Sequence, residues 1–531
     1  MKRKIISILF VLLAAVTLLA LASCNANLDA SAPNKGEEGK YPNSPNYNNA
    51  VNATNPEGTP LEPDEDDKEG ADDEVAGDED SSFENTFVEN PFVNTTQSNV
   101  STLSADVDTA SYTYFRKLVN SGYSWKELSR YSADFRTEEF LNYFKYTAKQ
   151  PDENELFSVN SMLLPCPWNA NNVLFTMTLQ AANATPTEGN NLVFLIDVSG
   201  SMMSSDKLPL LKKAFSHLTD QLTEKDTISI VTYSGKEAVV LDGCSGSKKE
   251  TILSAINSLK ASGSTNGQAG LQKAYQIAEK HRIEGGNNRI IMASDGDLNV
   301  GISSEAELKE FITQKRNAGI FLSVLGFGTG NYRDAKMETL ADNGNGVYLY
   351  VDGEAEAEKI FSTDLFANLY TVAKDVKMQI TFDKAYVSAF RLIGYENRIL
   401  NEEDFTDDTK DAGEVGAGHQ VTVCYELTLT EAAMAADTTW LELAVNYKLP
   451  EDTTSVFPNL YEIGYADYVK APDAERTFMI AVIETCMLLH NSKYLPQGFD
   501  LDNILHSLNA LDLSDYPERV EFRELLAKLN K

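Results

Sequence analysis

Oxygen-bearing side chains gather in three short segments in the middle of this 531-residue chain. Asp197, Ser199 and Ser201 alternate along the first segment, Thr265 lies in a Gly-containing second segment, and Asp295 opens the third. All five offer oxygen rather than sulfur or imidazole, and hard cations such as Mg²⁺ prefer oxygen ligands and keep some waters. These residue types therefore predict a divalent cation site, provided that the fold brings the three segments together.

The central part of the chain alternates buried strands with amphipathic helices. Residues 192–196 form a continuous apolar run, typical of a strand buried on both faces, and residues 208–222 carry apolar side chains at helical spacing. The alternation continues with strands expected at 227–233, 238–241, 289–293, 320–325 and 347–351. This pattern predicts an α/β fold with a doubly wound, mostly parallel sheet. Ligands of such sheets sit beyond the carboxyl ends of the strands, where the polar segments fall.

The polar segments also have a simpler interpretation, because Ser, Thr and Asp often cap the first turn of a helix. Capping explains each segment separately, but it does not explain their convergence at one edge of the sheet.

Two more oxygen-bearing residues, Asp297 and Asn299, follow in the third segment. They could hold a second cation or support the first ligands, although a plain polar loop is the simpler interpretation.

The three segments resemble the metal-ion-dependent adhesion site of von Willebrand factor type A (VWA) domains. The Asp-x-Ser-x-Ser pattern of Asp197, Ser199 and Ser201, the distant Thr265 and the later Asp-Gly at Asp295 match that site in order and spacing. The resemblance implies that the three hydroxyls bind the cation directly and that the aspartates bind it directly or through water. It also implies Mg²⁺ as the cofactor, with Mn²⁺ or Ca²⁺ as alternatives, and an open position for a carboxylate from a partner protein.

Segments of period-two alternation lie on both sides of the central domain. They cover residues 157–163 and 173–179 before it, and 376–382, 421–429 and 441–447 after it. Our hypothesis is that both groups form one β-sandwich-like unit into which the VWA domain is inserted. Apolar stripes near the end of the chain predict a helical C-terminal tail. The predicted regions are a signal peptide (1–23), a disordered acidic linker (24–90), an N-terminal flank (91–185), the VWA domain (186–370), a β-sandwich-like region (371–465) and a helical region (466–531).

The flanking segments resemble those of a family of bacterial VWA-domain lipoproteins. The segments that carry this resemblance are 104–112, 165–169, 391–398, 407–414 and 416–419. Together they extend the resemblance over residues 85–531. The family is sometimes labelled by analogy with chloride channel regulators, but this sequence predicts no pore because it has no second membrane span.

The N-terminal residues have the pattern of an export signal. Three basic residues precede an apolar stretch that ends in Leu-Ala-Ser-Cys24, which resembles a lipobox in which Cys24 becomes lipidated. A plain transmembrane anchor is the alternative, and either one places the chain outside the cytoplasmic membrane. Residues 61–90 carry 14 Asp/Glu and one Lys, and so read as an extended spacer. The net charge of −34 argues against a nucleic-acid partner.

Three functional hypotheses follow from these features. The favoured one is a non-enzymatic, surface-tethered module that binds a protein partner with an acidic side chain through Mg²⁺. A metal-dependent hydrolase is the first alternative, with Asp297 as the candidate base, because the five histidines lie outside the metal segments. An envelope scaffold with a structural metal is the second. The other four cysteines lack metal-site spacing. One disulfide between them would be compatible with an oxidising location, although the sequence does not pair them, and unpaired buried thiols are the simpler interpretation.

Overall fold

The computed structural model describes residues 87–530 apart from short internal gaps. The gaps are 184–187, 264–266, 297–304, 329–333, 436, 451, 453 and 457–459. The signal peptide, Cys24, almost all of the acidic linker, Thr265, Asp297 and Asn299 therefore lie outside the described residues. In the part of the chain that is described, no helix combines the length and apolarity needed to cross a bilayer.

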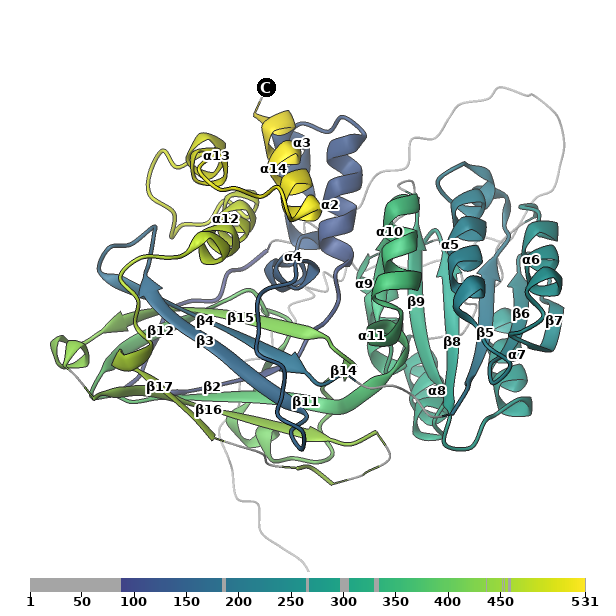
Figure 1. Cartoon of the computed structure of the whole chain (residues 1–531), viewed down its shortest axis with the longest axis horizontal. Helices are drawn as coiled ribbons and strands as arrows, with labels where there is room; N and C mark the ends of the chain where they lie inside the picture. Colours follow the sequence, from purple (N-terminus) through teal and green to yellow (C-terminus); the bar gives the residue numbers. More distant parts are fainter. Residues whose placement is uncertain are drawn as a thin grey trace, which may run out of the picture. The chain divides into compact units, whose positions relative to one another are not determined.

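The central domain is a six-stranded sheet with the strand order β10-β9-β8-β5-β6-β7 (Figure 1). All neighbouring strands pair in parallel except β7, which pairs with β6 in antiparallel fashion at one edge. The strands are β5 (Asn190–Asp197), β6 (Thr227–Tyr233), β7 (Ala238–Ser245), β8 (Asn287–Ser294), β9 (Phe321–Phe327) and β10 (Tyr348–Val351). The predicted doubly wound α/β fold is confirmed.

Helices cover both faces of this sheet because alternate residues of β5 belong to different cores. Val193 and Leu195 pack with α7, α8 and α9, whereas Phe194 and Ile196 pack with α5, α6 and α10. These helices are α5 (Leu208–Gln221), α6 (Lys249–Ser258), α7 (Gly267–Lys280), α8 (Glu305–Asn317), α9 (Asp334–Asn343) and α10 (Glu354–Glu358). A π-helical turn (Lys359–Thr363) and α11 (Leu365–Leu369) then lead into the next strand.

Two antiparallel sheets form a sandwich from strands on both sides of the central domain. Their strand orders are β1-β12-β15-β4-β3 and β13-β2-β11-β16-β17, and β14 pairs with β11. The strands before the central domain are β1 (Val93–Asn94), β2 (Val100–Ser104), β3 (Phe157–Pro165) and β4 (Asn172–Ala181). Those after it are β11 (Thr371–Phe382), β12 (Val387–Ile393), β13 (Ile399–Leu400), β14 (Gly413–Gly416), β15 (Gln420–Leu429), β16 (Thr439–Lys448) and β17 (Leu460–Gly464). The predicted insertion in a β-sandwich-like unit is confirmed, while the exact region boundaries stay predictions.

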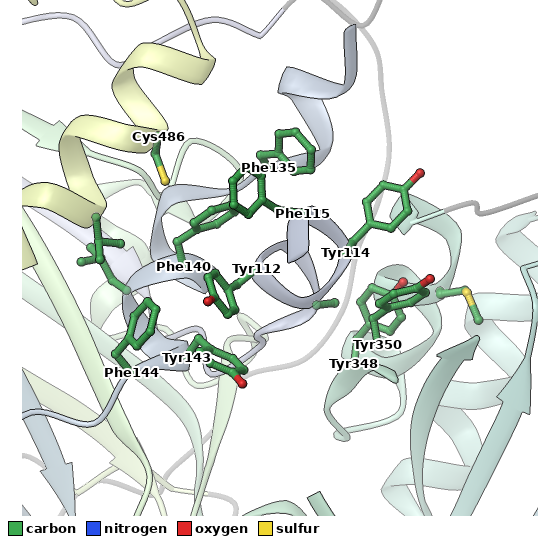
Figure 2. Close-up of a cluster of buried hydrophobic side chains, with 14 of the residues drawn as sticks. Tyr112, Tyr114, Phe115, Phe135, Phe140, Tyr143, Phe144, Tyr348, Tyr350 and Cys486 are labelled. Carbon is green, nitrogen blue, oxygen red and sulfur yellow. The ribbon is translucent and has the colours of Figure 1, made fainter. Parts of the chain in front are cut away.

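Helices from the two ends of the described chain pack together. The N-terminal ones are α2 (Ala110–Asn120), α3 (Trp125–Leu128) and α4 (Thr137–Tyr143), and the C-terminal ones are α12 (Ala474–Leu489), α13 (Leu501–Asn509) and α14 (Pro517–Leu529). Figure 2 shows their aromatic core, in which the Tyr112 ring lies 5.5 Å from Phe140 and 5.0 Å from Phe144. The same core reaches β10, because Tyr114 meets Tyr350 edge-on at 5.5 Å. The helical C-terminal tail is thus present, as three helices. The four described cysteines are free, as expected.

A buried carboxyl pair joins the helical region to the turn after β12. Burial raises the pKa of Glu138 to about 7, and the neighbouring Asp106 and Glu139 carboxylates add to this rise. Burial likewise raises the pKa of Glu396 to about 8, with Glu138 and Glu89 adding to the rise. In the unfolded chain both groups titrate near 4.5. The folded state therefore binds more protons between these values, and stability must fall as the pH rises from about 4.5 toward 8.

We expect Glu138→Gln to flatten this loss of stability, because glutamine carries no proton to release. The Tyr395 N–H that donates to Glu138 Oε2 at 2.8 Å keeps an acceptor in the variant. Thermal melts between pH 5 and pH 8 would measure the effect, with Glu442→Gln at an exposed position of β16 as the control. An unchanged pH slope in Glu138→Gln would show that this pair does not set it.

Candidate metal centre

The first and third predicted segments meet at the carboxyl edge of the central sheet. Strand β5 lies between β6 and β8, so that Asp197 pairs with Tyr233 on one side and Ile196 pairs with Ala293 on the other. Asp295 follows β8 directly. The strand order reverses at β5, and such switch points are where open α/β sheets leave room for ligands.

The loop after β5 aligns its oxygen atoms in a row. Asp197 Oδ1 accepts a hydrogen bond from the Ser199 N–H at 2.8 Å, and the Ser199 and Ser201 hydroxyls lie 2.9 Å apart. Asp197 and Ser199 are buried, whereas Ser201 is exposed. The row therefore runs from the interior to the surface, which gives a bound ligand access from solvent.

The segment that carries Thr265 is held next to this loop at its N-terminal end. The Ser262 N–H donates to the Val198 carbonyl at 2.7 Å, and the Gly200 N–H donates to the Gly263 carbonyl at 3.0 Å. Helix α7 then begins at Gly267. The chain just before Thr265 is thus fixed to the loop of Asp197, Ser199 and Ser201, although Thr265 itself is not described.

Asp295 faces a cation that the sequence did not predict. Its carboxylate is fully buried, and Oδ2 accepts from the Lys207 ammonium at 2.8 Å. The lysine stem crosses Gly328, where a Cβ would lie only 2.3 Å from Lys207 Cε and where φ is +75°. A side chain at position 328 would therefore block the lysine. The signal in the sequence was a basic residue just before α5, where the helix dipole disfavours positive charge.

Tyr233 forms the buried wall beside the two aspartates. Burial raises the pKa of its hydroxyl well above the usual value, and the neighbouring Asp197 and Asp295 carboxylates raise it further. The tyrosine therefore stays neutral and adds no charge to the site. The negative charge at this edge comes from the aspartates.

The N-terminal flank supports the loops behind the site. Lys117 of α2 forms an ion pair with Asp206 at 3.3 Å, one residue before Lys207. The Tyr350 hydroxyl donates to the Gly328 carbonyl at 2.6 Å, and Tyr114 of α2 packs against the Tyr350 ring (Figure 2). Helix α2 thereby helps to fix the glycine over which Lys207 passes.

The donor set fits a hard divalent cation. It combines carboxylate and hydroxyl oxygens, and Lys207 shows that Asp295 accepts a positive charge in this position. Across the residues with described coordinates, no group of three or more His, Cys, Asp or Glu is arranged to hold a metal ion. A cation at this edge would therefore depend on the serine and threonine hydroxyls as well as on the two aspartates.

Comparison with known proteins finds three family models that match successive parts of this chain. The model described as "von Willebrand factor type A domain" matches residues 191–363, and one described as "von Willebrand factor" matches residues 78–176. The model "Uncharacterized protein YfbK, C-terminal" matches residues 367–531. The chain is 38% identical to Escherichia coli (strain K12) YfbK over 426 residues, which are 75% of this chain and 72% of YfbK.

Other similarities have lower sequence identity. Inter-alpha-trypsin inhibitor heavy chain H3 of Homo sapiens is 28% identical over 187 residues, 34% of this chain and 21% of that protein. The solved structure "von Willebrand factor type A from Catenulispora acidiphila" is 16% identical with a TM-score of 0.40, covering 73% of this chain and 89% of that one.

Proposed function

The chain belongs to the YfbK family of proteins with a von Willebrand factor type A domain, and we propose that it binds a partner protein through Mg²⁺ held at the candidate metal centre. The ligands in this proposal are Asp197, Ser199, Ser201, Thr265 and Asp295, with Asp297 and Asn299 as supporting residues. The partner contributes an acidic side chain. The protein itself is not an enzyme in this proposal.

The observation that carries the proposal is the Lys207–Asp295 ion pair at 2.8 Å beside the Asp197–Ser199–Ser201 row. It supports a site in which buried carboxylate charge meets a cation at an edge that solvent reaches. A bound Mg²⁺ supplies an electrophilic position that a carboxylate can complete. Asp197 and Asp295 provide only two negative charges, one of them already shared with Lys207, so the loaded site stays attractive to an anion.

We also propose that the protein is held outside the cytoplasmic membrane by a lipid on Cys24. The acidic linker would then separate the described domains from the membrane surface, because like charges extend a chain. Its negative charge and the net charge of −34 disfavour nucleic acid as the partner. The support for this location is the sequence of the first 90 residues alone.

The proposal predicts that a protein captured from native envelope by the full-length chain is released by EDTA and recaptured when Mg²⁺ is restored. An Asp197→Ala chain should capture nothing under either condition, since its site lacks a ligand. The matched control is Asp206→Asn, which changes a residue of the same loop that is paired with Lys117 instead. Capture that is equal with and without EDTA would contradict the proposal.

A metal-dependent hydrolase is the alternative function. Three of the histidines have other contacts: His281 pairs with Asp242 at 2.6 Å, His419 accepts from the Gly416 N–H, and His490 contacts the Phe135 carbonyl. The other two, His217 and His506, lie outside the metal segments, so Asp297 remains the candidate base. Turnover that is abolished by Asp297→Asn while metal binding persists would favour the hydrolase.

Metal-linked stability without metal-linked partner binding would favour the scaffold instead.

A further inference from the structure

We infer that Lys207 is a built-in counter-ion of the metal site, which neutralises Asp295 when no metal is bound and lowers the affinity for the metal when one arrives. The inference rests on the proposed function and adds how the site is regulated. Its consequence is that metal and acidic ligand bind cooperatively: the metal alone binds weakly, and the partner's carboxylate completes the charge balance.

The position of Lys207 is built into the fold. Its N–H donates to the Ser204 carbonyl at 3.1 Å and its own carbonyl accepts from Leu211 at 2.8 Å, so the backbone is fixed at the start of α5. Its side chain is 13% exposed, and its stem occupies the space that Gly328 leaves. An exposed lysine would instead sample many rotamers and contribute little to an ion pair.

The charges of Asp295 and Lys207 explain what the lysine does at this position. A fully buried carboxylate such as Asp295 is costly unless a cation neutralises it. Lys207 meets this need in the metal-free protein, although its place at the start of α5 is unfavourable for a cation. A divalent cation bound by the same carboxylate must either displace the ammonium or remain close to it, and both lower the binding free energy of the metal.

The same repulsion favours an acidic ligand. With Lys207 beside Asp295, the loaded site carries the charge of the dication and the ammonium against two aspartates. The excess positive charge attracts a carboxylate from the partner, which in turn retains the metal. By linkage, metal and acidic ligand must then raise each other's affinity by the same factor.

The test is a titration of the metal-free full-length chain with Mn²⁺ alone, followed by calorimetry. We expect Lys207→Met to bind Mn²⁺ at least about 10-fold more tightly than the unmodified chain, because the competing charge is gone. In EDTA the variant should melt at a lower temperature, and saturating Mn²⁺ should remove this difference. Lys207→Arg keeps the charge and should keep the weak affinity.

The matched control is Lys213→Met, which removes an exposed lysine of the same helix that is paired with Glu354. It should change neither the Mn²⁺ affinity nor the melting temperature in EDTA. Unchanged or weaker Mn²⁺ binding by Lys207→Met would overturn the inference, as would a variant that stays unfolded in saturating Mn²⁺. Absence of Mn²⁺ binding in the unmodified chain and in every variant would instead overturn the proposed function, so the two failures are distinguishable.

Discussion

Replacement of Arg398 by Met is expected to lower the free energy of unfolding by about 3–5 kcal/mol, because it leaves the buried Asp106 and Asp108 carboxylates without this cation. The guanidinium lies 3.3 Å from Asp106 and 3.7 Å from Asp108 of the N-terminal flank. It also lies 3.1 Å from Glu338 and 2.8 Å from Asp342 of α9 in the VWA domain. One side chain thus joins the inserted domain to the unit that receives it.

Denaturant unfolding of the full-length chain measures this effect. Arg282→Met is the matched control, because Arg282 is exposed and donates to the Ala318 carbonyl at 2.6 Å. Its effect should stay within about 0.5 kcal/mol, as for most surface substitutions. Equal losses in the two variants would mean that the carboxylate cluster is stable without Arg398.

Asp197→Asn is expected to weaken Mn²⁺ binding by at least about 100-fold. This decrease in affinity is larger than the one expected on loss of a residue that only supports a metal ligand. Asparagine keeps an oxygen that can accept the Ser199 N–H, so the loop has the same hydrogen-bond partner as before. The change removes charge from a fully buried position without removing volume. Mn²⁺ affinity therefore reports on the charge of Asp197 rather than on the integrity of the loop.

Calorimetric titration of Asp197→Asn and of Asp206→Asn separates the two sides of this loop. Asp206 pairs with Ser204 and Lys117, neither of which is a predicted ligand, so its variant should bind Mn²⁺ as the unmodified chain does. If the two variants lose affinity to the same extent, loop distortion explains the loss. If Asp197→Asn loses none, Asp197 is not a ligand.

The sequence was sufficient to predict the doubly wound sheet because its signals are local. The run at 192–196 is apolar at every position, and β5 proves to be buried on both faces by helices. The sandwich was predictable from alternation in the same way, although the pairing of its strands was not. Strand β4 pairs with β15, and no local pattern specifies a partner so distant along the chain.

The candidate site was likewise predictable only where its signals are local in the sequence. The oxygen-bearing residues were found because they follow predicted strands and repeat a recognisable spacing. Lys207 was missed because its partner Asp295 lies 88 residues away and its path depends on Gly328 from a third loop. Arg398 was noticed only as part of a flanking segment, since its four carboxylate partners come from two distant segments, residues 106–108 and α9, that meet in the folded chain.

The proposed metal site is tested most directly by the anomalous difference map of crystals of the full-length chain grown with Mn²⁺. We expect one strong peak at the carboxyl edge of β5 and β8, within bonding distance of the Ser199, Ser201 and Thr265 hydroxyls and beside the Asp197 and Asp295 carboxylates. A map without a peak at this edge, or with Mn²⁺ bound only elsewhere, would contradict it.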